Sequence, residues 1–101
     1  MTYRLTEVAE SDLVDIHDFI AKGSPRHALQ MFDRFEGIFS LITVSPLAGT
    51  SRNELEQGIR SYPVGSYIIF YHLDGSYIVI DRVLHSARDI DFISIRTRCS
   101  Y

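Results

Sequence analysis

Six residues in the second half of the chain combine side chains that can hold an anion with side chains that can move a proton. They are Arg60, Tyr67, Arg82, His85, Arg88 and Asp89. Guanidinium groups bind phosphate and carboxylate through paired hydrogen bonds, and a positioned histidine or tyrosine can act as a general acid or base. Together, these residue types could hold a scissile phosphate and transfer a proton beside it.

The same residues also have a structural interpretation, which the sequence leaves open. Arg82 could stack on Tyr67, and His85 could anchor the last turn of the strand. Arg88 and Asp89 could form an ion pair near the end of that strand. The spacing weakens the catalytic interpretation, because Arg82 and His85 are three positions apart and therefore point to opposite faces of a regular strand. A bulge or a strand end would be needed to bring them together.

Metal and cofactor chemistry finds little support in the spacing of the potential ligands. The four histidines form no HxH or HExxH motif: His17, His27, His72 and His85. The single cysteine, Cys99, excludes an internal disulfide bond and a CxxC metal site. The sequence also has no GxSxG, P-loop or GxGxxG motif. We therefore expect no metal and no cofactor.

The elements that must position the six residues are β-strands. Two runs rich in β-branched and aromatic residues, Ser66–Leu73 and Ser76–His85, are separated by Asp74-Gly75. An Asp-Gly pair is typical of a two-residue type I′ turn, so the two runs are predicted to form a β-hairpin.

The position of that turn fixes the predicted register, in which Tyr67 lies opposite Arg82. A third strand, Ile59–Tyr62, is predicted to precede the hairpin and to turn at Pro63–Gly65. The face occupied by Arg60 stays open, because a shift of one residue in this turn moves its side chain to the other side of the sheet.

The first half of the chain has a helical pattern. Apolar residues recur at three- and four-residue spacing from Thr6 to Lys22, which predicts an amphipathic helix. Three carboxylates lie along this stretch, Asp12, Asp15 and Asp18. At these spacings we interpret them as the solvated face of the helix.

A second helix has a specific start signal in Ser24 followed by Pro25, because serine caps a helix and proline is favoured at its first position. Apolar residues then repeat at helical spacing as far as Val44, for about 18–20 residues. The short link Gly23-Ser24 predicts that the two helices form an antiparallel αα-hairpin.

The predicted order of elements is β-α-α-β-β-β, with a short first strand at Tyr3–Thr6. This is an α+β fold in which an αα-hairpin packs on a small antiparallel sheet. We expect one domain over residues 1–101, with a polar connector at 45–58 that could include one helical turn, and a tail at 93–101. No apolar run reaches the roughly 18 residues of a membrane span, and no signal-peptide pattern opens the chain. We therefore expect a cytoplasmic protein without membrane contact.

The net charge of −3 argues against a protein whose whole surface binds nucleic acid. The charge is uneven: residues 1–51 contain four basic residues and seven carboxylates, whereas residues 52–101 contain six of each. We expect no direct DNA binding by this chain alone, and we expect any anion recognition to use the arginines of the second half.

The strand region resembles the ParE/RelE toxin superfamily. The resemblance lies in Ile59–Tyr62 followed by Pro63, in the run from Gly65 to Tyr71, and in the run from Ile78 to Asp89, which ends in RVLHSARD. That ending is similar to the R-V-L-H-(G/S)-A-R-D form of ParE-type members, with Ser86 in place of a common glycine. The helical hairpin also fits, as do several upstream residues: Ala9, Asp12, Leu13, Ile16, Pro46 and Gly49. The resemblance covers residues 2–92.

This resemblance implies the toxin of a bacterial toxin–antitoxin pair, with a ParD-like antitoxin whose C-terminal segment folds as it wraps the toxin. ParE-like members inhibit DNA gyrase without being known nucleases, whereas RelE-like members are ribosome-dependent mRNA endonucleases. The resemblance implies that a RelE-like site has lysines and arginines clustered on the sheet, often with a late tyrosine or a histidine–tyrosine pair and a glutamate base. This chain has no such pair, so we expect a gyrase inhibitor that is not an enzyme. The alternative is an mRNA endonuclease using Arg60, Arg82 and His85.

The toxin interpretation also predicts contact residues. We expect an apolar groove between the helical hairpin and the sheet edge, with arginines at its rim, because the helices carry more apolar surface than one small sheet should bury. The candidates for antitoxin or target contact are Ile16, Phe19, Ile20, Phe35, Arg60, Tyr67, Arg82, His85 and Arg88. The four helical candidates could equally be ordinary core residues.

Overall fold

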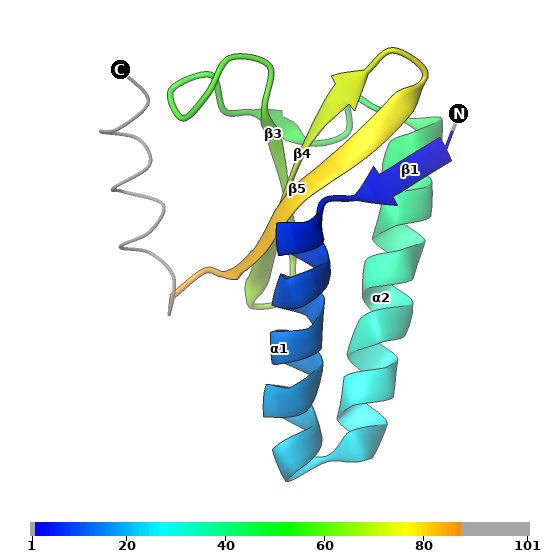
Figure 1. Cartoon of the computed structure of the whole chain (residues 1–101), viewed down its shortest axis with the longest axis vertical. Helices are drawn as coiled ribbons and strands as arrows, with labels where there is room; N and C mark the ends of the chain where they lie inside the picture. The colour runs from blue at the N-terminus through cyan, green and yellow to red at the C-terminus, as the bar shows by residue number, and fades with distance from the viewer. Residues whose placement is uncertain (1, 88–101) are drawn as a thin grey trace.

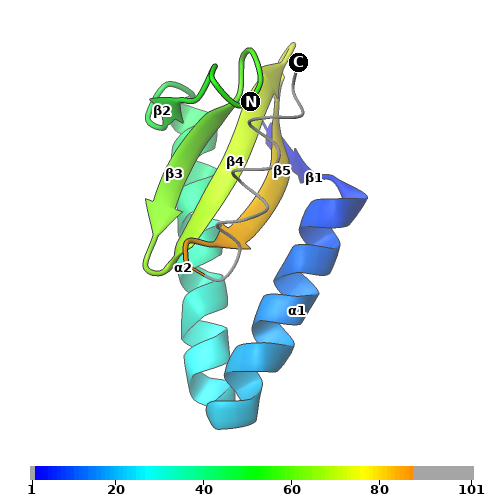
Figure 2. The same cartoon turned by 90° about the vertical axis from the view of Figure 1, so that its left-hand side faces the viewer.

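The chain folds as a helical hairpin that covers one face of a twisted β-sheet (Figures 1 and 2). A computed structural model describes residues 2–87. Its elements, in chain order, are β1 (Thr2–Leu5), α1 (Glu7–Gly23), α2 (Pro25–Val44), β2 (Thr50–Ser51), β3 (Arg60–Val64), β4 (Tyr67–Asp74) and β5 (Tyr77–His85). The predicted α+β architecture is confirmed, with the two-residue β2 as an additional strand inside the predicted connector.

Within the described residues the strand order is β1-β5-β4-β3-β2. The three long strands form an antiparallel meander, and β1 joins it parallel to β5. The first strand of the chain therefore lies beside the last described one. None of the helices in residues 2–87 is long and apolar enough to cross a membrane.

The two helices begin where the sequence predicts. The Thr6 side chain accepts a hydrogen bond from the Ala9 N–H at 3.0 Å and so caps α1. Ser24 caps α2 in the same way by accepting from the His27 N–H at 3.3 Å, with Pro25 at the first helical position. The predicted αα-hairpin, with α2 extending to Val44, is confirmed.

The main core lies between the helical hairpin and the sheet. Its buried residues are Ala9, Ile16, Phe35, Phe39, Ile42, Val64, Tyr67, Ile69, Tyr71, Ile78, Ile80 and Val83. Each large apolar side chain buried here contributes about 1.5–3 kcal/mol to folding. A smaller cluster covers the opposite face of the sheet and contains Leu55, Ile59, Phe70 and Leu84. Both faces of the central strands are therefore covered.

The connector before β3 holds part of this second cluster in place. The Arg52 N–H donates to the Ile59 carbonyl at 2.9 Å, and the Asn53 side chain accepts from the Gly58 N–H at 3.0 Å. The turn predicted at 53–57 forms without becoming a helix. The Glu54 carboxylate accepts a hydrogen bond from its own backbone N–H and another from Arg52. These two bonds hold the pKa of Glu54 below its ordinary value.

The predicted loop of the β4–β5 hairpin begins one residue too early, so the predicted strand pairing near the turn is wrong by two residues. Asp74 pairs with Tyr77, so the loop residues are Gly75 and Ser76 rather than Asp74 and Gly75. Gly75 has φ +62°, and no non-glycine residue described has a positive φ. A type I′ turn needs two positive φ values, whereas a type II′ turn needs one, at a glycine in the first loop position. The Gly-Ser pair fits the second turn.

The β3–β4 turn follows the same rule. Gly65, with φ +59°, and Ser66 form the loop, and Val64 pairs with Tyr67. The predicted turn at Pro63–Gly65 therefore began too early. Pro63 is tolerated within β3 because β2 pairs only with Ser61 and Arg60, which leaves the outer side of Pro63 without a described strand neighbour.

A bulge further changes the register of β5. Phe70 pairs with Arg82 while the next residue, Tyr71, pairs with Ile80, which leaves Asp81 as the extra residue. As a result Tyr67 lies opposite His85, and the predicted pairing of Tyr67 with Arg82 is wrong.

The edge of β5 has two different neighbours along its length. β1 pairs with it over Tyr77–Ile80. From Ile80 onward the neighbour of β5 is the start of α1. The Thr6 N–H donates to the Ile80 carbonyl at 3.1 Å, and the Thr6 hydroxyl donates to the Asp81 carbonyl at 3.0 Å. Nearly two turns further along α1, Asp12 accepts from the Val83 N–H at 3.0 Å. Backbone groups of β5 that a strand would satisfy are thus satisfied by the cap residue Thr6 and by the Asp12 side chain.

Candidate interaction site

Arg82 is held by α1. Its Nε donates to Asp12 Oδ2 at 2.8 Å and its Nη2 donates to Asp12 Oδ1 at 3.0 Å, which makes a bidentate pair. The Arg82 side chain is 25% exposed and the Asp12 side chain 13% exposed. The predicted stacking of Arg82 on Tyr67 is therefore wrong, and so is the interpretation of Asp12 as a solvated carboxylate. The cause is a partner about seventy positions away, which helical spacing alone could not reveal.

His85 packs at the end of the sheet. Its ring lies edge-on against Tyr67, with centroids 5.2 Å apart, and Tyr67 in turn meets Phe35 at 5.7 Å. Nδ1 of His85 accepts from the Ala87 N–H at 3.2 Å, so the neutral ring carries its proton on Nε2. The Ser86 N–H donates to the Ser66 carbonyl at 2.8 Å. This arrangement agrees with the structural interpretation of His85. Arg88 and Asp89 lie outside the described residues, as does the predicted tail at 93–101.

Arg60 holds the loop that follows α2. Its Nε donates to the Gly49 carbonyl at 3.0 Å and its Nη2 to the Leu47 carbonyl at 3.4 Å. The buried Tyr71 hydroxyl reinforces this loop by donating to the Pro46 carbonyl at 2.8 Å and accepting from the Gly49 N–H at 2.9 Å. A Cβ at Gly49 would lie only 2.6 Å from this hydroxyl. The loop is therefore fixed by buried polar contacts and requires glycine.

The three residues of the nuclease alternative are not assembled into a site. Arg60 pairs across the sheet with Tyr71, whereas His85 pairs with Tyr67, four residues along β4. Four residues of strand separate the two rows by about 13 Å. Arg82 lies opposite Phe70, whose side chain belongs to the outer face, and its guanidinium is held by Asp12.

The helical contact candidates divide into buried and exposed residues. Ile16 is 1% exposed and Phe35 is 2% exposed, and both belong to the main core. Ile16 offers no surface to a partner, so the structure corrects its interpretation as a contact residue, whereas Phe35 reaches the surface only at the bottom of an apolar groove. Phe19 is 59% exposed, and Ile20 is half-buried against the core.

An apolar groove runs beside β1, the edge strand of the described sheet. Its first part, about 180 Å³, lies between both helices and β1 and is lined by Tyr3, Leu5, Leu13, Phe32, Phe35, Glu36 and Phe39. Its second part, about 350 Å³, is lined by Thr2, Tyr3, Ser40, Thr43 and Val44. Tyr3 borders both parts. We call this surface the β1 groove. It is apolar, as the sequence predicts for a groove between the helical hairpin and the sheet edge, but the predicted arginines are not among its lining residues.

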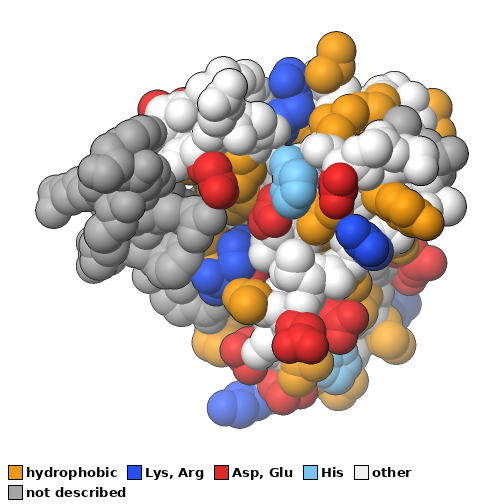
Figure 3. All heavy atoms as spheres, turned by 45° about the horizontal axis from the view of Figure 1, so that its top comes forward, with side chains coloured by type: hydrophobic (Ala, Val, Ile, Leu, Met, Phe, Trp, Pro, Cys, Tyr) orange, Lys and Arg blue, Asp and Glu red, His pale blue; other side chains and the backbone are white. Residues whose placement is uncertain are grey.

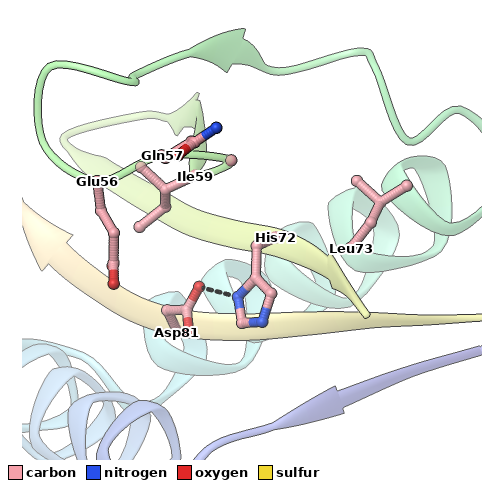
Figure 4. A pocket seen from close by; sticks show the side chains of 7 residues that line it. Glu56, Gln57, Ile59, His72, Leu73 and Asp81 are labelled. Atoms are coloured by element: carbon pink, nitrogen blue, oxygen red, sulfur yellow. Dashed lines mark hydrogen bonds and ion pairs between the residues drawn. The ribbon is translucent and has the colours of Figure 1, made fainter. Parts of the chain in front are cut away.

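A different, polar hollow lies on the opposite side of the sheet (Figure 4). It has a volume of about 290 Å³ and is lined by Glu56, Gln57, Gly58, Ile59, His72, Leu73 and Asp81. Nδ1 of His72 lies 2.7 Å from Oδ2 of Asp81. The sequence did not predict this pair, because the predicted register places His72 opposite Tyr77, whereas in the structure His72 pairs with Val79, two residues from Asp81.

Charged side chains of the described residues do not form a broad basic surface on the face shown in Figure 3, where lysine and arginine are scattered among acidic and hydrophobic side chains. Among residues 2–87, no group of three or more histidine, cysteine, aspartate or glutamate side chains is placed to hold a metal ion. The site thus offers apolar grooves and isolated ion pairs.

Comparisons with known proteins agree with this architecture. The family described as ParE toxin of type II toxin-antitoxin system, parDE, matches residues 3–90. Toxin ParE3 of Caulobacter vibrioides is 32% identical over 57 residues, which is 56% of this chain and 57% of that relative, so the chain spans little more than half of the relative's length.

A solved structure of the chromosomal ParDE TA system from P. aeruginosa has the same fold. Its TM-score is 0.71 at 20% sequence identity, over 84% of this chain and 95% of that chain. At this identity the structural similarity bears on the fold alone. The family match, in contrast, extends over most of the chain, and the protein therefore belongs to the ParE toxin family of type II toxin–antitoxin systems.

Proposed function

We propose that this protein inhibits DNA gyrase by protein–protein binding in the cytoplasm and that it is not an enzyme. Family membership supports this proposal. The main structural observation behind it is that Arg60, Arg82 and His85 each have a separate role in the fold. Arg60 binds the carbonyls of the loop after α2, Arg82 binds Asp12, and His85 packs on Tyr67. A phosphodiester substrate would need them to converge.

We further propose that a ParD-like antitoxin neutralises the protein by binding in the β1 groove. The groove lies along an edge strand and is lined mostly by apolar and aromatic side chains. An antitoxin segment that folds on binding could bury apolar side chains there. Val44, which lines the groove and is 82% exposed, is the position where a change would disturb binding with least effect on the fold.

A supercoiling assay tests the gyrase proposal. Purified protein is added to gyrase, relaxed plasmid and ATP, with and without antitoxin. We expect loss of supercoiling and accumulation of linear DNA with protein attached to its ends, both reversed by antitoxin. A protein that is toxic in cells but leaves gyrase fully active would contradict the proposal and would direct the search to ribosome-bound mRNA.

A further inference from the structure

The end of the helical hairpin projects away from the sheet (Figures 1 and 2). Its composition differs from that of the rest of the hairpin. We call residues 19–30, from Phe19 to Gln30, the hairpin tip. It contains Lys22 and Arg26 and no carboxylate. The remainder of α1 carries five carboxylates and no basic residue: Glu7, Glu10, Asp12, Asp15 and Asp18. The tip is therefore a positively charged end on an otherwise acidic helix pair.

Both cations of the tip are available to a partner. Lys22 and Arg26 are exposed, and so is His27, which follows Arg26 in the chain. Neither Lys22 nor Arg26 forms an ion pair with any residue in the described part of the chain. Two unpaired cations within five positions favour an anionic partner.

The tip also exposes large apolar side chains. Phe19 is 59% exposed and Leu29 is 66% exposed, one on each helix of the hairpin. The residues beneath them are packed: Ile16 and Ala28 are buried, and the His17 and Phe32 rings meet edge-on at 5.4 Å. Exposed apolar anchors on a rigid support are what protein interfaces use at their centres, because little conformational freedom is lost on binding.

We propose that the hairpin tip is the surface that contacts the protein target, with Phe19 and Leu29 entering an apolar pocket and Lys22 and Arg26 pairing with carboxylates at its rim. This inference rests on the proposed function and adds the surface that performs it. A protein partner is favoured over the DNA backbone for two reasons. Two cations release few counterions from DNA, and a phosphate backbone offers no place for the two apolar side chains.

The tip and the β1 groove lie at different parts of the hairpin. The lining of the groove comes from β1, from Leu13 of α1 and from residues 32–44 of α2, whereas the tip covers residues 19–30. Target contact and antitoxin contact should therefore be separable by mutation, and Phe19, a candidate for either partner, belongs to the target side.

Two double variants of the whole protein test the proposal, Lys22→Glu with Arg26→Glu and Phe19→Ser with Leu29→Ser. We expect each to raise the concentration needed for half-inhibition of gyrase by about tenfold or more, which corresponds to two interface contacts of moderate strength. Antitoxin affinity and the midpoint of thermal unfolding should stay within experimental error of the unmodified protein. Because all four side chains are exposed, folding is not expected to fail.

Matched controls distinguish the tip from the helices in general. Lys22→Arg with Arg26→Lys keeps both charges and should inhibit gyrase normally. Val8→Ser removes an exposed apolar side chain at the opposite end of α1 and should also leave inhibition unchanged. Val44→Glu should weaken antitoxin binding while leaving inhibition intact.

The outcomes separate this inference from the proposed function. If the unmodified protein inhibits gyrase and folded tip variants inhibit equally well, the inference is wrong. If the unmodified protein does not inhibit gyrase, the proposed target is wrong, and the toxicity of the tip variants in cells then tests the inference. Loss of toxicity supports the tip as the contact for another protein. Retained toxicity overturns the inference. An unmodified protein that is neither inhibitory nor toxic would overturn both. Tip-dependent binding of the isolated toxin to a fluorescent DNA duplex would overturn the choice of a protein partner.

Discussion

Two arginine–aspartate pairs link the beginning of the chain to the β4–β5 hairpin, and they differ in surroundings. Arg4 lies 3.5 Å from Asp74, and both side chains are more than half exposed. Arg82 binds Asp12 in a bidentate pair that is mostly shielded from water, and Asp12 also accepts a hydrogen bond from the backbone of β5. Exposed pairs contribute little because water screens them, whereas a buried partner left alone loses its solvation. An arginine–aspartate pair is therefore expected to contribute more to folding stability at the Arg82 end of β5 than beside its beginning.

Replacing Asp12 tests this difference most strongly. Asp12→Ala leaves the Arg82 guanidinium and the Val83 N–H without their acceptor, and we expect the free energy of unfolding to fall by about 2–4 kcal/mol. Urea denaturation of the purified protein measures this loss. Asp15→Ala, at an exposed position one turn along the same helix, is the control and should change stability by less than about 0.5 kcal/mol. Equal effects of the two substitutions would show that the Asp12–Arg82 pair has no special role.

A buried polar contact without charge should have an intermediate effect. Tyr71→Phe keeps the ring in the core but removes the hydroxyl that binds Pro46 and Gly49. We expect a loss of about 1–2 kcal/mol in the free energy of unfolding, because the Gly49 N–H is left unsatisfied. Thermal unfolding followed by circular dichroism would detect it. Tyr62→Phe is a control with the same chemical change at a half-buried tyrosine; if both variants unfold at one temperature, the loop contacts of Tyr71 are not stabilising.

The exposed pair should be the least sensitive. Arg4→Ala removes both the contact with Asp74 and the stacking of its guanidinium over Tyr77, whose ring centroid lies 5.0 Å away. At such exposure we expect a loss of about 1 kcal/mol or less, decreasing as salt is added. Urea denaturation at low and high salt measures both quantities. A loss as large as that of Asp12→Ala would mean that exposure does not set the strength of these pairs.

Local signals in the sequence predicted the helices well. Ser24-Pro25 and the spacing of apolar residues depend on interactions within a few positions, and the structure confirms the resulting hairpin. The two sheet turns were harder. Asp74-Gly75 is a stronger turn signal than Gly75-Ser76 by composition, but strand pairing and the bulge at Asp81 decide which residues form the loop.

The roles of the motif residues could not be predicted, because they depend on distant partners. Arg82 is held by a carboxylate in the first helix, and Arg60 by carbonyls of a loop whose path the sequence does not indicate. The ending RVLHSARD nevertheless identified the family correctly, since resemblance to a family does not require knowing what each residue contacts. Much of the described part of this motif serves the fold: Arg82 binds α1, and His85 packs on β4.

The parallel pairing of β1 with β5 has a consequence for synthesis. Thr2 pairs with Tyr77, so β1 cannot pair with β5 until most of the described chain has been synthesised. At typical rates of about 5–20 residues per second, this interval is roughly 4–15 s. During it, Asp12 also lacks Arg82, and neither the sheet edge nor the β1 groove has its final form. The sheet edge of a newly made chain is therefore completed only several seconds after β1 has been synthesised.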